Sequence, residues 1–181
     1  MTTSVVLFER DLRVRDNDLL SHAAELGEVI PLVVLSDRFR TRLPEIPNRA
    51  RFLVETLDDL RGALSDRGAT LAVRCGDRDA ILAEYGADHV FAADHYAAVA
   101  PGAVTPAGGD RYKVFTPYWN RWRQVSLGTV RTGPRHIKTP RGLDSDPIDW
   151  LRAIEPTASA LARGGEAAAH ETLNETPLRI G

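Results

Sequence analysis

Short hydrophobic runs alternate with amphipathic stretches over the first half of the chain. Four runs that each contain valine are typical of buried strands, and they occupy residues 5–8, 28–37, 70–73 and 88–93. Three stretches with helix signals separate these runs, at residues 18–26, 48–67 and 77–86. Strands and helices that alternate in this way predict a parallel sheet with helices on both faces.

The helix signals are strongest in the second of these stretches. Four leucines recur there at spacings of three or four residues and form one apolar face, namely Leu53, Leu57, Leu60 and Leu64. The first helix has two candidate N-cap residues, Asp16 and Asn17. Residues 38–47 contain two prolines and are predicted to form a loop. Beyond residue 94 we expect only short helical segments, over residues 118–124, at a turn over 148–151 and on either side of Gly164-Gly165 within 158–173.

Composition narrows the class of protein. A chain of 181 residues with a net charge of −2 fits one globular domain and does not indicate a generally basic nucleic-acid binder. The single Cys75 excludes an internal disulfide and fits a reducing cytoplasm. No apolar run is long enough to span a membrane. The five histidines have no metal-ligand spacing, and neither a Walker loop nor a G-x-G-x-x-G motif is present. We therefore expect a cytoplasmic protein with no metal site and no membrane contact.

Several motifs resemble those of one family. The run Phe8-Glu9-Arg10-Asp11-Leu12-Arg13, followed by Asp16-Asn17, is similar to the opening of DNA photolyases and cryptochromes, although Glu9 replaces a basic residue. Residues 49–60, Tyr112–Trp119 (Y-K-V-F-T-P-Y-W) and Gly164–Ala168 (G-G-E-A-A) resemble further motifs of that family. The resemblance implies a doubly wound α/β fold, Rossmann-like or flavodoxin-like. We expect the strand order 3-2-1-4.

The sequence departs from the family pattern in three places. The chain stops where the family's helical FAD domain begins, so the resemblance implies an α/β domain at 1–125, an irregular linker with a short helical tail at 126–181, and no FAD site. Residues 96–112 are too few for the family's next helix and strand, so we expect the edge strand 5 to be missing. At the family's folate-binding element only Tyr96 is retained, between Ala93 and Ala97.

In open parallel sheets, ligands bind outside the carboxyl ends of the strands. The resemblance implies that an antenna chromophore, a deazaflavin, folate or flavin, would lie there. The candidate binding residues at this edge are Phe8, Glu9, Arg10, Leu35, Ser36, Asp37, Asp94 and Tyr96, with Arg51 on the neighbouring helix for an anionic tail. A structural interpretation is favoured for the turn itself, in which Arg10, Asp11, Arg13 and Asp16 form an ion-pair and capping network. No catalytic residue is predicted.

Residues 111–143 contain eight basic residues, several aromatic residues and no acid. Such a composition can bind single-stranded nucleic acid. The interpretation favoured from sequence is different: the aromatic residues anchor the segment on the open side of the sheet. DNA contact by this chain alone is therefore not expected.

Three hypotheses for function remain open. The first is a non-catalytic photolyase-like domain that binds an antenna chromophore, a nucleotide-like ligand or a flavin-bearing protein partner. The second is a component of a DNA photolyase that works in light-dependent DNA repair only with a separate FAD domain. The third is an inactive remnant, which predicts poor folding because the lost edge strand leaves backbone unpaired on the fourth strand.

Overall fold

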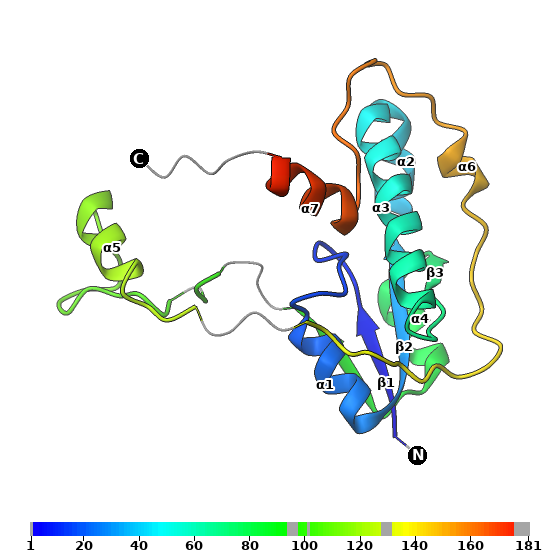
Figure 1. Cartoon of the computed structure of the whole chain (residues 1–181), viewed down its shortest axis with the longest axis horizontal. Coiled ribbons are helices and arrows are strands. Elements are labelled where there is room, and N and C mark those ends of the chain that lie inside the picture. Colours follow the sequence, from blue (N-terminus) through cyan, green and yellow to red (C-terminus); the bar gives the residue numbers. More distant parts are fainter. Residues whose placement is uncertain (1, 94–97, 101, 128–131, 176–181) are drawn as a thin grey trace. The chain divides into compact units, whose positions relative to one another are not determined.

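The computed structural model describes residues 2–93, 98–100, 102–127 and 132–175, and its elements are labelled in Figure 1. The chain forms two compact units. The first unit comprises Met1–Ala92 together with Arg131–Gly181, and the second comprises Ala93–Val130.

The first unit is built on a parallel sheet of four strands. The strands are β1 (Thr2–Leu7), β2 (Gly27–Leu35), β3 (Ala72–Cys75) and β4 (His89–Ala92). Their order is β3-β2-β1-β4, and Val5 of β1 lies beside Ile30 of β2 and Val90 of β4. The predicted fold class and strand order are confirmed. Within the described ranges, no fifth strand pairs with β4.

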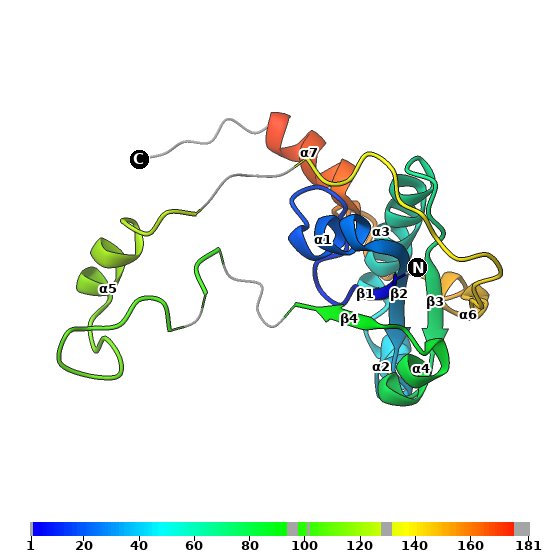
Figure 2. The ribbon, with the colours of Figure 1, turned by 90° about the horizontal axis from the view of Figure 1, so that it is seen from below.

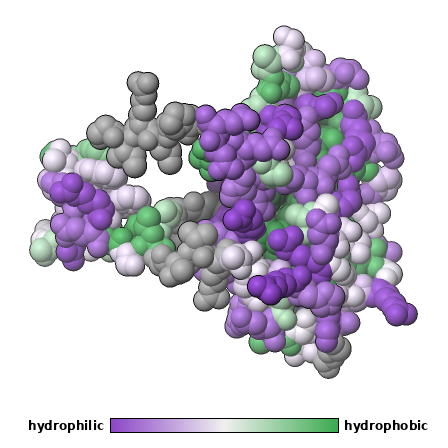
Figure 3. Space-filling view, in the orientation of Figure 1, coloured by the Kyte–Doolittle hydropathy of each residue, from purple (hydrophilic) through white to green (hydrophobic). Residues whose placement is uncertain are grey.

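Helices cover both faces of this sheet. Figure 2 shows α1 (Asp18–Leu26) and α3 (Pro47–Ser65) on one face and α4 (Arg78–Tyr85) on the other. Side chains of β1 alternate between the two sides: Val6 packs in the larger core under α1 and α3, and Leu7 packs in the smaller core against α4. This alternation follows from the two-residue period of a strand. The surface of the first unit that is visible in Figure 3 is mainly hydrophilic.

Helix α1 has the predicted bounds, and the structure decides between its two candidate caps. Asn17 is the N-cap, because its Oδ1 accepts a hydrogen bond of 3.0 Å from the backbone N–H of Leu20. Asp16 instead occupies the turn before the cap, with φ of 51°. This left-handed conformation is tolerated by Asp and Asn better than by most residues.

The prediction of a loop at residues 38–47 is wrong. The segment forms helix α2 (Asp37–Arg42) and a single 3₁₀ turn, η1 (Leu43–Glu45), and α3 begins one residue later, after Ile46. The two prolines do not interrupt this helical structure, because Pro44 and Pro47 lie within the first two positions of η1 and α3. An N–H at such positions has no partner within the helix, so proline costs little there.

The segment after residue 132 runs back along the first unit and covers the outer edge of β3. The Asp146 N–H donates to the carbonyl oxygen of Val73 at 2.7 Å, and the Asp146 carboxylate accepts from the Cys75 N–H at 2.7 Å. A covered edge cannot pair with another chain. Farther along lie the short helix α6 (Asp149–Arg152), where a turn was expected, and α7 (Glu166–Glu175). Helix is found only after Gly164-Gly165 within 158–173, so the expected helix before that pair is wrong.

The second unit contains helix α5 (Phe115–Trp122), which begins three residues before the predicted start at 118. Residues 98–100 and 102–114 are irregular where they are described. Over the described part of both units, no helix combines the length and the apolar character needed to cross a bilayer.

Candidate functional site

The turn between β1 and α1 is held by its own hydrogen bonds. The guanidinium of Arg13 donates to the carbonyl oxygen of Asp16 at 2.8 Å, and the Asn17 side-chain amide donates to the carbonyl oxygen of Arg13 at 3.1 Å. Phe8 and Val14, on either side of the charged cluster, are fully buried. The turn is therefore a fixed wall at the carboxyl end of β1.

A residue from the other end of the chain completes this wall. The carboxylate of Glu166, in the first turn of α7, accepts hydrogen bonds from the backbone N–H groups of Val14 at 2.9 Å and Arg15 at 3.1 Å. These N–H groups precede α1 and have no partner within a helix. Sequence reasoning missed this role of Glu166, although the G-G-E motif marked the position.

A cavity of about 570 Å³ lies at the carboxyl ends of β1 and β2. Five of the candidate residues line it, namely Phe8, Glu9, Arg10, Leu35 and Ser36. Sequence reasoning missed other lining residues from the turn and the helices, which include Leu12, Phe39, Arg49, Phe52, Leu53 and Thr56. The hydroxyl oxygen of Ser36 accepts from the Phe39 N–H at 3.3 Å, so its own proton is available to a ligand.

The remaining candidate residues lie elsewhere. Arg51 donates to the Glu55 carboxylate at 2.7 Å and does not line the cavity. The arginine of α3 that does line it is Arg49, which lies over the ring of Phe39 at 5.7 Å. Two residues of a helix that are two positions apart lie on nearly opposite faces, so only one of these arginines can face the cavity. Asp37 pairs with Arg40 outside the cavity.

Asp94 and Tyr96, the two candidates that follow β4, lie outside the described residues. Among the described residues, the cavity is lined from β1, the turn after it, β2, α2 and α3.

The polar face of α3 binds the C-terminal part of the first unit, residues 132–175, which we call the returning segment. The Glu55 carboxylate accepts from the Gly164 N–H at 2.9 Å, and the Asp59 carboxylate accepts from the Glu166 N–H at 2.7 Å. Arg152 forms a two-pronged ion pair with Asp58, at 2.5 and 2.8 Å. Because Glu166 also holds the turn after β1, docking of this segment on α3 and the position of the cavity wall are linked.

Glu55 makes this docking dependent on pH. The hydrogen bond from Gly164, followed by that from Arg51, lowers the pKa of Glu55. A lowered pKa in the folded state contributes stability above the ordinary glutamate pKa of about 4.3, and this contribution is lost as pH falls through the lowered value. We expect proteolysis of residues 157–175 to accelerate as the pH falls below about 4.

The variant Glu55→Gln keeps an oxygen acceptor for Gly164 and removes the titrating group. Measured by proteolysis with an acid-tolerant protease, its pH dependence over the same range should be weaker than that of the original chain. Identical pH profiles for the two chains would contradict the assignment to Glu55.

The other pKa shifts indicate structural pairs. Arg74 donates hydrogen bonds to Tyr85 and Glu84, which raise its pKa, and the hydrogen bond that Arg152 donates to Asp58 raises the pKa of Arg152. Burial raises the pKa of the Cys75 thiol and favours its neutral form. No group of three or more metal-ligating side chains occurs among the residues described. With aromatic walls and two arginines, the cavity is suited to binding a flat, anionic molecule.

Comparison with known proteins agrees with this architecture. A family model for DNA photolyase matches residues 4–100. The deoxyribodipyrimidine photo-lyase of Streptomyces griseus is 34% identical over 93% of this chain and 45% of its own length. Cryptochromes of the DASH type also match. The chain spans a little under half the length of such relatives.

Solved structures of photolyases share the fold. A bacterial class III photolyase from Agrobacterium tumefaciens superposes with a TM-score of 0.79 at 21% identity, over 96% of this chain and 44% of that one. An archaeal photolyase from Sulfolobus tokodaii, solved with two FAD molecules and described as implying a novel light-harvesting cofactor, superposes with a TM-score of 0.74 at 20% identity, over 97% of this chain and 46% of that one.

Proposed function

The chain belongs to the DNA photolyase family, and on this premise we propose that its first unit binds an antenna chromophore in the cavity at the carboxyl ends of β1 and β2. The observation that carries the proposal is the composition of that cavity, which combines aromatic walls with the guanidinium groups of Arg10 and Arg49. Its volume of about 570 Å³ lies in the range of small-molecule sites.

Each chemical group of such a ligand has a counterpart in the cavity. Phe39, Phe52 and Leu53 offer apolar surface to a flat ring system, and Ser36 offers a hydroxyl proton. Arg10 and Arg49 can pair with a phosphate or carboxylate tail. Folates and flavin nucleotides combine a flat ring with an anionic tail, and deazaflavins share the flat ring. The Sulfolobus tokodaii photolyase, described with a second FAD, makes a flavin one of the candidates.

The proposed role is to collect light rather than to perform chemistry. The proposal assigns no chemical step to the described residues that line the cavity. A flavin-bearing domain or protein partner would receive the excitation. The similarity to deoxyribodipyrimidine photo-lyase over 93% of the chain supports light-dependent DNA repair as the process served.

The test is an absorption spectrum, with mass spectrometry, of the chain purified from a host that makes deazaflavin, folate and flavin. We expect a stoichiometric ligand with a near-ultraviolet or blue band. The variant Arg49→Gln should bind the ligand about 10-fold more weakly or worse, because a charge-assisted hydrogen bond contributes roughly 1.5–3 kcal/mol. The matched control Arg51→Gln, which removes the same charge from the opposite face of α3, should bind normally. A bare chain that takes up none of the three ligands would contradict the proposal.

A further inference from the structure

Helix α5 of the second unit carries a stripe of aromatic side chains on one face. They recur at the spacing i, i+3, i+4, i+7, as Phe115, Tyr118, Trp119 and Trp122. At this spacing such a stripe normally packs in a core. Here Phe115 is 70% exposed, Tyr118 37% and Trp119 43%.

The exposed rings are stacked on one another. Phe115 and Trp119 lie with ring centroids 6.3 Å apart and planes 13° from parallel, and Trp119 and Trp122 lie 5.3 Å apart and 14° from parallel. The three rings therefore form a nearly parallel ladder. A ladder of this kind can be extended by further flat rings at its exposed faces.

Positive charge lies along both sides of the stripe. Arg121 follows Tyr118 by three residues and Arg123 follows Trp119 by four, so the two exposed arginines flank the rings. No acidic residue occurs between Arg111 and Leu143. We call the six residues of the stripe and its flanks the α5 face: Phe115, Tyr118, Trp119, Trp122, Arg121 and Arg123.

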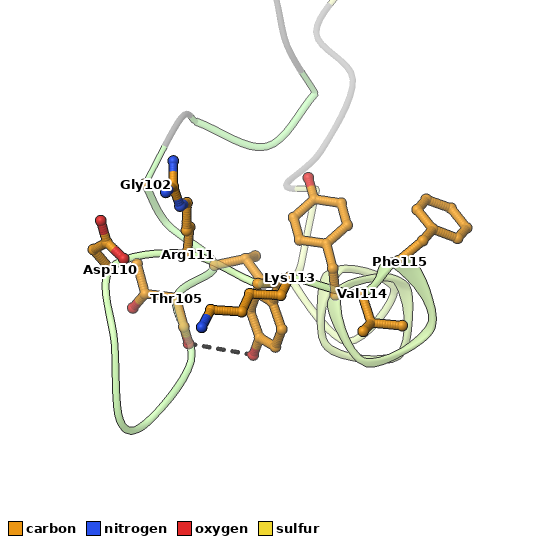
Figure 4. Close-up of a pocket in the computed structure, with 10 residues that line it drawn as sticks. Gly102, Thr105, Asp110, Arg111, Lys113, Val114 and Phe115 are labelled. Carbon is orange, nitrogen blue, oxygen red and sulfur yellow. Dashed lines mark hydrogen bonds between the residues drawn. The ribbon is translucent and has the colours of Figure 1, made fainter.

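A cavity of about 390 Å³ adjoins the start of α5 (Figure 4). Its wall continues the same chemistry, because its lining residues include Arg111, Tyr112 and Lys113, together with one acid, Asp110. The Tyr112 hydroxyl donates to the carbonyl oxygen of Thr105 at 3.3 Å, which fixes this ring against the loop. Aromatic and cationic groups thus continue from the helix into a concave surface.

We propose that the α5 face binds single-stranded nucleic acid, with bases stacked on the ladder and phosphates paired with the arginines. This inference is independent of the chromophore cavity. The positive charge of the arginines favours a polyanion as the ligand. The stacked rings favour a polyanion that carries flat groups. A membrane surface fits less well, because the stripe contains no aliphatic residue. The sequence-based interpretation that these rings anchor the segment on the sheet stays a prediction, and the exposure of Phe115, Tyr118 and Trp119 is what supports an external ligand.

The test is fluorescence anisotropy of a labelled oligothymidylate of about 20 nucleotides, titrated with the full chain at low salt. We expect saturable binding that weakens steeply as salt is added. Trp119→Ala should weaken binding roughly 5- to 150-fold, the effect of losing one base stack, and Trp119→Phe should restore most of it. The double variant R121Q/R123Q should reduce the slope of log affinity against log salt by about 1.4.

Two controls separate stacking from charge alone. Arg38→Gln removes a charge from the exposed surface of α2 and should leave both affinity and salt slope unchanged. Polyglutamate of matched charge should compete poorly, since it has no flat groups. The proposal is overturned if polyglutamate competes as well as unlabelled oligothymidylate, if Trp119→Ala binds normally, or if the chain binds only anionic phospholipid vesicles. Self-association that Trp119→Ala abolishes, without oligonucleotide binding, would instead identify a second copy as the occupant.

Discussion

Leu57→Ala is expected to reduce the free energy of unfolding by about 2–5 kcal/mol. Leu57 has no exposed surface and lies in the larger core, where α3 packs on the sheet. Truncation removes three buried carbon atoms and leaves a cavity that the surrounding strands cannot collapse to fill, because the sheet is fixed by its hydrogen bonds. For a protein of ordinary stability this loss is a large part of the total.

Leu53→Ala is the matched control on the same helix. Leu53 is only partly buried and lines the cavity at the carboxyl ends of β1 and β2. The substitution Leu53→Ala should reduce the free energy of unfolding less than Leu57→Ala does, and it should weaken chromophore binding. Urea denaturation followed by circular dichroism gives the first quantity, and ligand stoichiometry after purification gives the second. Equal losses of stability in the two variants would contradict the assigned packing of α3.

The fold could be predicted because each strand and helix is specified locally. The run from Val29 to Leu35 contains only apolar residues, which indicates a strand buried on both faces, and the structure places it between β1 and β3. The four leucines of α3 gave the buried face of that helix, and three of them have at most 1% exposed surface. The spacing of apolar residues along the chain indicates which positions are buried, and these buried positions determine how the strands and helices pack.

The site was predicted only in part, because it depends on contacts between distant segments. The carboxyl-edge rule found Phe8, Arg10 and Ser36, which lie within three residues of the end of a strand. The choice between Arg49 and Arg51 required the rotational phase of α3 relative to the sheet. No local signal marks the hydrogen bonds that the Glu166 carboxylate accepts from the turn after β1, since those residues lie more than 150 positions apart.

The loop assigned to residues 38–47 shows a different weakness. Two prolines within a few residues indicate a break, yet each stands at a position where a helix can begin. The expectation that the aromatic residues of 111–143 anchor this segment on the sheet stays a prediction. A helical stripe of aromatic residues indicates a core face, but the pattern cannot say whether a partner surface is present.

Gly164→Ala is expected to release the returning segment from α3. A Cβ atom at Gly164 would lie 2.2 Å from the carbonyl oxygen of Phe52 and 2.7 Å from the hydroxyl oxygen of Thr56. The first contact is with helix backbone, which cannot move aside without breaking α3. Overpacking of this kind costs about 1–3 kcal/mol or more. Relief of the clash would move Gly164 away from Glu55 and loosen the hold of Glu166 on the turn after β1.

The same methyl group can be added to α3 at a position with free space. No atom lies within 4 Å of a Cβ built on Gly62, so Gly62→Ala should stabilise the helix by about 0.5–1 kcal/mol. The two variants are therefore expected to shift the thermal midpoint in opposite directions. Limited proteolysis should cut residues 157–175 faster in Gly164→Ala only, and the chromophore should be held less tightly because the cavity wall has lost its support. If Gly164→Ala kept the midpoint and the cleavage rate of the original chain, the docked segment could not be what holds that wall in place.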